Sequence, residues 1–590
     1  ARSVGVKNGV IVLDGGEAGT VNVAGTLDAS GRNAGETGGE VKVLGDQVAL
    51  AGTAALDASG DAGGGTVLVG GNYQGKGPER NATRTTIAAG ATLKADAITN
   101  GDGGTVVAWA DDSTSFRGAI SARGGSQGGN GGSVEVSGKQ KLGFDGTVDT
   151  RAPNGQTGTL LLDPVHAIVS DGSQDTSGNT WTINAGSLAE NLQTTNQVVQ
   201  ADQTITVNAA ITYAGTNNTN TLKFQDDTPA DGLTVDLNAA ITLAAGQRLL
   251  GDATVVNVNG ASARIQNGID VAKAGATVNV AAGTYNESVT IDKALTLDGE
   301  GAGTTRLESD KAGKGKGIVV GASDVTVQGL EISGYNYGVE LTGTSNDVTL
   351  ANLALSDNTY GVWMGAGVKA DGFTMRDSKI TGGKIGVYQE SKLAADDTPT
   401  SSFSNARFER VEISDATFKG IYLESADDLV VTDVTIKNAG NVGYDEKDYN
   451  YGHGIDINLK YDDFGTITFN NVVVEDSGYS SGRPTGAAVV IKTRGVPGDS
   501  ASYTKRPATL QAVNINGGSI EGSQGQGLRI EDLSNGAGGQ PTVRINGMRF
   551  VDNGMDIVVG KTNVDATGAT FEGAADGFAI EDRVYHALDQ

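Results

Sequence analysis

The chain has 590 residues, of which 90 are glycine, only 9 are proline and none is cysteine. Glycine is about twice as frequent as its usual ~7%, without the proline content of a collagen-like repeat. The lack of cysteine excludes a disulfide framework, a thiol nucleophile and cysteine-ligated metal sites. The net charge of −27 argues against nucleic acid as a partner, because phosphates would be repelled. The sequence also has no apolar run of about 18 residues, so it predicts no membrane span.

A Gly-Gly pair followed by a short strand recurs through residues 1–172. The phrase occurs as GGEVKVLG (38–45), GGTVLVGG (64–71), GGTVVAWA (103–110) and GGSVEVSG (131–138). Valine alternates with other residues, which is the two-residue period of a strand with one buried face, and the glycines suit turns with positive φ. A single glycine-rich sheet would be marginally stable, whereas stacked coils bury one continuous core. The repeats therefore predict an all-β fold, a parallel β-helix or solenoid.

The segment GTLLLDPVHAIVSDG (158–172) follows these repeats. Together they resemble the filamentous-haemagglutinin-type exoproteins of two-partner secretion systems in Gram-negative bacteria, over about residues 1–260. The resemblance implies secretion past an outer-membrane transporter and an extracellular, cell-surface location. The family's NPNG-type secretion motif is missing, and Asn154-Gly155 in APNGQTG is no substitute, so the chain resembles a processed or truncated middle section. Residues 173–260 are rich in Thr, Asn and Ala and are interpreted as less regular coils.

From residue 261 the sequence resembles the opening of pectate-lyase-like right-handed β-helices, with a short helix expected at about 264–272. This region is expected to run to residue 576, and 577–590 to form either a C-terminal capping helix or a linker. A glycine before an apolar strand marks successive coils of about 21–25 residues: Gly338, Gly361, Gly386, Gly420, Gly454, Gly486, Gly527 and Gly577. Longer steps predict loops near one flank, at 390–402, 440–452, 459–465, 495–507 and 533–541.

Two columns of outward-pointing residues follow from aligning the coils on that glycine. Two places after it stand Glu340, Trp363, Tyr388, Tyr422, Asp456, Ala488 and Arg529. Two places further stand Thr342, Gly365, Glu390, Glu424, Asn458, Val490 and Glu531. Because coils lie about 4.8 Å apart, the aromatic residues should form an exposed ladder with carboxylates beside it. Such a ladder either binds sugar rings, with Asp456 and Arg529 contributing, or only stabilises the sheet.

YGHGIDI (451–457) and VVIKTRG (489–495) resemble motifs of polygalacturonases. The resemblance would make His453 the motif histidine and Lys492 the lysine that binds a substrate carboxylate. The sequence departs from the pattern at Val490, where the family has arginine, and at Lys419, where an aspartate is expected. Inverting glycosidases need two carboxyl groups about 6.5–9.5 Å apart. Asp456, Glu424 and Glu390 are the candidates, and a lyase would instead use a base such as Lys492, Arg494 or Arg529 near His453.

Acidic loop residues offer a candidate calcium site. Asp445, Asp448, Asp462 and Asp463 carry the hard oxygen ligands that Ca²⁺ prefers, although such loop carboxylates are also commonly solvated. No other cofactor is expected.

Three functions remain open from the sequence. The first is a secreted adhesin or matrix protein that binds host or matrix polysaccharide on its C-terminal coils. The second is a polysaccharide lyase or glycoside hydrolase, and the third is a structural spacer within a larger exoprotein. The fold itself does not distinguish them.

Overall fold

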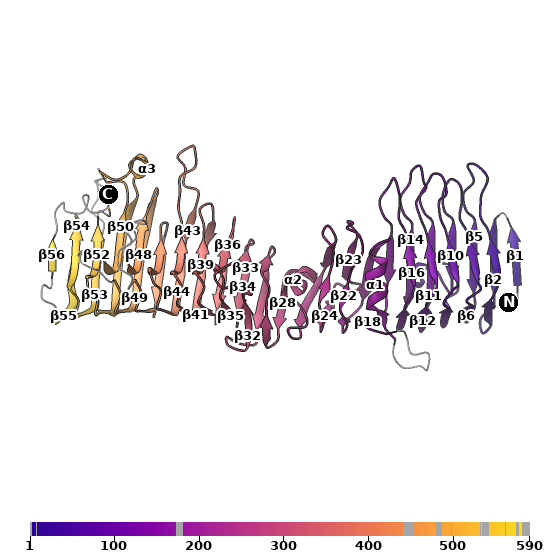
Figure 1. Cartoon of the computed structure of the whole chain (residues 1–590), viewed down its shortest axis with the longest axis horizontal. Helices are drawn as coiled ribbons and strands as arrows, with labels where there is room; N and C mark the ends of the chain where they lie inside the picture. The colour runs from indigo at the N-terminus through magenta and orange to yellow at the C-terminus, as the bar shows by residue number, and fades with distance from the viewer. Residues whose placement is uncertain are drawn as a thin grey trace. The chain divides into compact units, whose positions relative to one another are not determined.

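The computed structural model describes residues 3–7, 9–172, 181–440, 452–478, 486–496, 498–531, 533, 542–560, 562–573 and 578–580. The chain divides into two compact units, residues 1–278 (unit 1) and 279–590 (unit 2). Each unit is a stack of β-coils in which a strand pairs in parallel with the equivalent strands of the coils before and after it (Figure 1). The parallel β-helix expected from the repeats is therefore confirmed.

Unit 1 contains a ten-stranded sheet within its described residues. Its strands are β1 (Ser3–Lys7), β2 (Val10–Asp14), β5 (Glu40–Leu44), β8 (Thr66–Val69), β11 (Thr105–Ala110), β14 (Ser133–Gly138), β17 (Thr159–Leu162), β20 (Asn196–Ala201), β23 (Thr221–Asp226) and β26 (Arg248–Gly251). All pairs are parallel except β1 with β2, which is antiparallel. An antiparallel strand laid on the first coil covers an edge that would otherwise offer unpaired backbone groups.

The core of unit 1 is a column of small aliphatic residues. Strand register places Val41, Val67, Val106, Val134 and Leu160 beside one another, and none of the five side chains is exposed. Burying each side chain contributes about 1.5–3 kcal/mol. The alternating valines of the sequence therefore do what the repeat predicts: they fill a narrow interior one coil at a time.

The Gly-Gly pairs form a seam along one corner of these coils. The second glycine of successive pairs (Gly39, Gly65, Gly104 and Gly132) donates its N–H to a carbonyl at 2.7–2.8 Å. A Cβ atom there would lie only 2.0–2.1 Å from a backbone oxygen of the neighbouring coil. The glycines are thus required by the close approach of two backbones, as well as by turns.

Unit 2 contains an eleven-stranded parallel sheet within its described residues. Its strands are β30 (Val289–Ile291), β33 (Lys316–Val320), β36 (Tyr337–Leu341), β39 (Tyr360–Met364), β42 (Ile385–Gln389), β45 (Lys419–Leu423), β48 (His453–Leu459), β50 (Ala487–Thr493), β52 (Gln526–Glu531), β54 (Met555–Gly560) and β56 (Phe578–Ile580). Their inward residues form a buried aliphatic column that includes Val339, Val362, Val387 and Ile421.

The strand register corrects one step of the sequence alignment. Asp456 pairs with Val490, not with Ala488, and Asn458 pairs with Lys492, not with Val490. The coil mark in β50 is therefore Ala488 rather than Gly486, because a small residue other than glycine takes the position there. The error moved one coil by two residues and left the other coils unchanged.

The helices of the described residues are short. They are η1 (Tyr73–Gly75), α1 (Ala185–Asn191), α2 (Ile265–Val271) and α3 (Ala501–Lys505). Helix α2 confirms the short helix expected at 264–272, and its Ile265, Ile269 and Val271 are buried. None of the described helices has the length and hydropathy to cross a membrane. Of the predicted terminal segment, only β56 is described; residues 577 and 581–590, where a capping helix was expected, lie outside the described residues.

Candidate functional site

The outer face of β36, β39, β42 and β45 carries a cluster of aromatic rings. Trp363 pairs in register with Tyr388, and Tyr388 with Tyr422. The ring centroids of Trp363 and Tyr388 are 4.7 Å apart in an edge-on contact, and those of Tyr388 and Tyr422 are 4.7 Å apart and stacked. All three side chains are half-buried. The three residues singled out from the sequence therefore form one continuous ladder.

Two further rings belong to this cluster. Tyr337 and Tyr360 stack at 5.5 Å, and Trp363 lies 5.2 Å from the first and 4.9 Å from the second. Both tyrosines immediately precede the glycine that marks their coil. An alignment of the positions after that glycine does not include these two tyrosines, although the repeated Tyr-Gly pair is a signal for them. The aromatic cluster is defined here as Tyr337, Tyr360, Trp363, Tyr388 and Tyr422.

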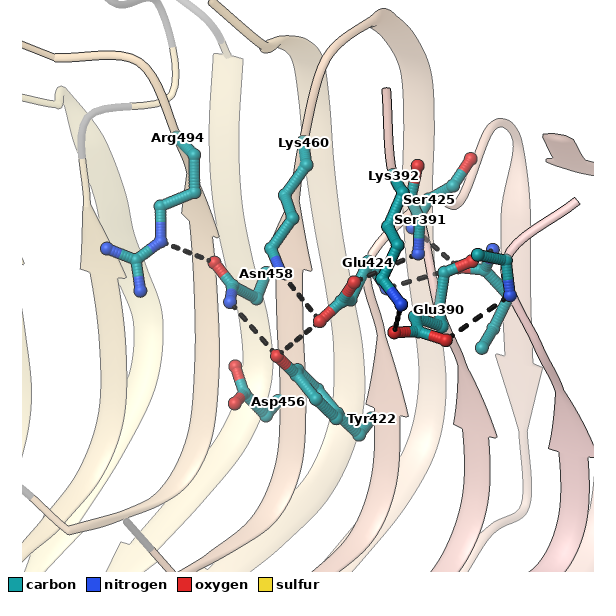
Figure 2. A network of polar contacts seen from close by, with 12 residues as sticks. Glu390, Ser391, Lys392, Tyr422, Glu424, Ser425, Asp456, Asn458, Lys460 and Arg494 are labelled. Carbon is teal, nitrogen blue, oxygen red and sulfur yellow. Dashed lines mark hydrogen bonds and ion pairs between the residues drawn. The ribbon is translucent and has the colours of Figure 1, made fainter. Parts of the chain in front are cut away.

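A network of polar contacts borders the aromatic cluster (Figure 2). The Tyr422 hydroxyl donates to Glu424 at 2.7 Å, and Lys460 forms an ion pair with the same carboxylate at 2.6 Å. The Ser391 backbone N–H donates to the other Glu424 oxygen at 2.9 Å, and the Asn458 amide donates to the Tyr422 hydroxyl at 3.3 Å. Burial and then the nearby Glu424 charge raise the pKa of Tyr422 well above its ordinary value. The phenol therefore stays protonated and acts as a donor.

Helix α3 and its flanking loop contact this network through Tyr503. The Tyr503 ring lies 5.4 Å from the Lys460 ammonium, 5.6 Å from the Arg494 guanidinium and 5.5 Å from the Tyr461 ring. Arg494 also donates to the Asn458 amide oxygen at 2.9 Å. The inserted segment thus packs against one end of the network.

Two of the predicted lateral loops come together. Lys505 at the end of α3 forms an ion pair with Asp397 at 3.0 Å, so the insertions 495–507 and 390–402 lie against each other. The other predicted insertions contribute less to this description, because 441–451 and 534–541 lie outside the described residues.

Asp456 is buried instead of exposed. It is 2% exposed and forms an ion pair at 2.6 Å with Lys419, which is 5% exposed and lies 3.6 Å from the centroid of the Tyr422 ring. Burial alone would raise the pKa of Asp456, but Lys419, followed by Lys492 and His453, lowers it below its ordinary value. The expectation that this residue points into solvent is wrong, since every residue of β48 is buried.

His453 is also buried. One ring nitrogen lies 3.0 Å from the Ala487 carbonyl and 3.2 Å from its backbone nitrogen. Burial lowers the pKa of His453 to about 3, against the opposing pull of Asp456. The imidazole therefore remains neutral near pH 7, and as a base it is weak.

The remaining predicted ligand-binding residues are distributed over the same sheet. Glu390 forms an ion pair with Lys392 at 2.7 Å, at the edge of the aromatic cluster. Arg529 and Glu531 form an ion pair with each other, and both are buried, so the expected exposure of Arg529 is also wrong. Lys492 is half-buried beside Asn458 in the register of β48 and β50.

Two of the four predicted calcium ligands, Asp462 and Asp463, lie in the described residues. Asp462 forms an ion pair with Arg506 at 3.3 Å, and Asp463 accepts a hydrogen bond from Thr509. Asp445 and Asp448 lie outside the described residues. Where side chains are described, no group of three or more histidine, aspartate or glutamate residues is placed to hold a metal ion.

Asp456 does not fit the proton-donating role in glycoside hydrolysis. A glycosidase needs a carboxyl group that holds its proton until it protonates the leaving oxygen. Asp456 is held ionised by Lys419, and Glu424 is tied to Lys460, Tyr422 and Ser391. The aromatic cluster, by contrast, offers half-exposed rings that a ligand could contact.

Comparison with known proteins supports the fold. Residues 316–495 match a family model described as a right-handed β-helix region. This match agrees with the predicted right-handed parallel β-helix, and it covers less than half of the chain. No curated protein sequence matches the chain.

Two solved structures show distant resemblance. An alginate lyase from Paenibacillus sp. str. FPU-7 is 15% identical, with 54% of this chain and 98% of that chain covered and a TM-score of 0.34. The catalytic domain of Agl-KA is 12% identical, with 79% of this chain and 62% of that chain covered and a TM-score of 0.20. At such TM-scores neither resemblance is an argument about what this chain does.

Proposed function

We propose that the aromatic cluster of unit 2 is a carbohydrate-binding surface, and that the protein is a secreted adhesin or matrix protein of the cell surface. The observation that carries the proposal is the cluster itself. Five rings from four successive coils lie within 4.7–6.2 Å of their neighbours on one face of a sheet. A flat, half-exposed aromatic surface suits the apolar CH face of a pyranose ring.

The polar residues beside the rings supply the second requirement of sugar binding. Glu390 and Lys392 lie at the edge of the cluster. Carboxylate and ammonium groups accept from or donate to sugar hydroxyls. Their mutual contacts hold them in place before a ligand arrives, which lowers the entropic cost of binding.

The proposed surface location is supported by the sequence resemblance alone. The Gly-rich repeats and the GTLLLDP segment resemble those of secreted filamentous-haemagglutinin-type exoproteins, which leave the cell through an outer-membrane transporter. Antibodies raised against residues 279–440 should label intact cells that produce the protein. Labelling that requires cell lysis would contradict the surface location and would leave the binding proposal to be judged separately.

The binding proposal is tested with the full chain on an array of acidic and neutral polysaccharides. Retention on the array is measured together with the release of reducing and unsaturated sugar ends. We expect retention without release. Trp363→Ala should weaken binding about tenfold, because losing a buried aromatic contact typically costs more than 1 kcal/mol.

A matched control is Phe571→Ala, which removes an exposed aromatic ring from β55 (Val564–Glu572), outside the aromatic cluster. This variant should bind as the unaltered chain does. Release of sugar ends that is lost in Asp456→Asn would make the protein an enzyme. Neither retention nor release would favour a structural spacer.

A further inference from the structure

Unit 1 has a cavity that none of the sequence patterns indicated. It has a volume of about 610 Å³ and lies between the loop that contains η1, the Trp109 side chain on β11, and residues that follow β17, β20 and β23. Small-molecule sites in proteins are typically about 300–1,000 Å³. The cavity is thus large enough for a small organic ligand.

The η1 loop is fixed over the sheet by specific contacts. The Gln74 backbone N–H donates to Glu135 at 2.9 Å, and the Asn81 amide donates to the Gly75 carbonyl at 2.9 Å and to Asp111 at 3.1 Å. Gly75 packs so closely on the Trp109 ring that a Cβ there would lie 2.6 Å from it. The loop therefore forms a wall of the cavity and is not a loose excursion.

Trp109 contributes an aromatic surface to this cavity. Its indole N–H donates to Asp111 at 3.0 Å, which fixes the ring orientation. The side chain is largely buried, in contact with Leu68 and Val107, and part of it lines the cavity. Trp109 is 4% exposed, so the cavity meets only a small part of the indole; an electron-rich ring beside carboxylates attracts organic cations.

The charges around the cavity are mainly negative. Asp111, Asp163, Asp202 and Asp227 line it, against two lysines, Lys76 and Lys139. A fifth carboxylate lies behind the η1 loop: Glu135 is 1% exposed, and its Oε1 accepts no hydrogen bond from the described residues. A buried carboxylate oxygen without a hydrogen-bond partner is costly, and among the described residues no lysine or arginine forms an ion pair with Glu135.

These carboxylates disturb one another. Burial raises the pKa of Asp163 to about 7, with further contributions from Asp227 and Asp202 against the opposing charge of Lys76. Burial likewise raises the pKa of Glu135 to about 7, and Asp163 adds to the shift. The pKa of Asp202 is raised by burial and by Asp227. A cation in the cavity would stabilise the ionised carboxylates and so lower their pKa values.

A metal ion is the less suitable occupant, since no three carboxylates of the described residues are close enough together to hold one. We propose that the cavity of unit 1 binds an organic cation, with an ammonium group directed to Asp163 and its neighbours and the adjoining carbon groups against Trp109. This site is independent of the carbohydrate-binding surface, because it lies in the other unit and uses different residues.

The test uses the full chain and choline, a permanent cation, measured by isothermal titration and by tryptophan fluorescence. The neutral comparison ligand is 3,3-dimethylbutanol, which has the same shape without the charge. We expect choline to bind and the neutral alcohol not to bind. Affinity should rise about fivefold to tenfold from pH 6 to pH 8, as Asp163 and Glu135 lose their protons.

Two variants should change the affinity in opposite directions. Asp163→Asn should weaken choline binding about fivefold to tenfold at pH 8 and flatten the pH dependence. Lys139→Gln, which removes an exposed cation from the rim, should tighten binding about twofold. Misfolding would weaken binding, so tighter binding by Lys139→Gln would report on the removed charge. Glu190→Gln, the same change of charge as Asp163→Asn at an exposed residue of α1, should leave binding unchanged.

Three results would overturn the proposal. Equal binding of choline and the neutral alcohol would make the cavity an apolar site. Displacement of choline by micromolar CaCl₂ would make it a metal site. The absence of choline binding at millimolar concentration at pH 8, in a chain that retains its β-sheet circular dichroism, would show that the cavity has no such function.

Discussion

Two buried carboxylates of unit 2 and two of unit 1 are held in opposite ways. In unit 2, Asp456 and Glu424 each contact a lysine ammonium at 2.6 Å. In unit 1, Glu135 and Asp163 are 1% and 9% exposed, and no lysine or arginine of the described residues lies within ion-pair distance of either. A carboxylate paired with a lysine is held ionised and stabilises the fold. A buried carboxylate without a countercharge destabilises the folded state, and a cationic ligand would offset that cost. The same architecture therefore provides a structural network in one unit and a candidate ligand site in the other.

The largest effect is expected when the lysine that pairs with Asp456 is removed. Lys419→Met should lower the free energy of unfolding of unit 2 by about 3–5 kcal/mol, because Asp456 then remains buried without its countercharge. Hydrogen exchange of the amides in β45 and β48 measures the loss within unit 2.

The double variant Lys419→Met with Asp456→Leu is the control. Replacing both partners by apolar groups should restore most of the loss, since no unpaired charge remains. If the single and double variants were equally unstable, the packing around Lys419 would matter more than its charge, and the contrast between the units would fail.

The unpaired carboxylates of unit 1 should make its stability depend on pH. The folded-state pKa values of Glu135 and Asp163 are raised to about 7, so the folded state binds protons more tightly than the unfolded chain. The stability that these two groups contribute to unit 1 should therefore be greatest below pH ~4, fall as the pH rises towards 7, and then level off. The loss should be at most about 3–4 kcal/mol for each group.

Amide exchange in β11 and β14, measured between pH 5 and pH 8 after correction for the intrinsic rate, follows this loss. Glu135→Gln should reduce the slope, because an amide does not titrate. A stability that increased over the same range would mean that the two acids are ionised and compensated in the folded state.

The exposed ion pair between the two lateral loops should matter least. The side chains of Lys505 and Asp397 are 59% and 52% exposed, so solvent and salt screen their attraction. Asp397→Asn should change the free energy of unfolding by less than about 1 kcal/mol, as measured by denaturant titration. A larger change would show that the contact orders the loops beyond its own attraction.

The fold could be predicted from the sequence because it depends on spacing. Valine alternation, Gly-Gly pairs and the glycine of each coil are local signals, and they predicted the parallel coils and the ladder of Trp363, Tyr388 and Tyr422. Helix α2 was expected from the resemblance to pectate-lyase-like β-helices. In β50, Ala488 takes the place of that glycine, so the predicted alignment of this coil was wrong by two residues.

The chemistry of the cavity could not be predicted in this way. Asp163 stands within the GTLLLDP segment, and Glu135 within an ordinary repeat, so each residue matched a pattern that explained it otherwise. Glu135 contacts Gln74, which is 61 residues earlier in the chain. Burial and charge accumulate across coils, and no single stretch of sequence carries that information.

The glycine seam of unit 1 has a consequence for how such a chain can evolve. Because each coil meets the next through backbone atoms alone at this corner, a whole coil can be duplicated or deleted and the new neighbours still fit. Adding part of a coil would place a side chain where a carbonyl oxygen lies. Relatives of this chain should therefore differ in length by complete repeats, and each repeat changes the reach of the stack by about 4.8 Å.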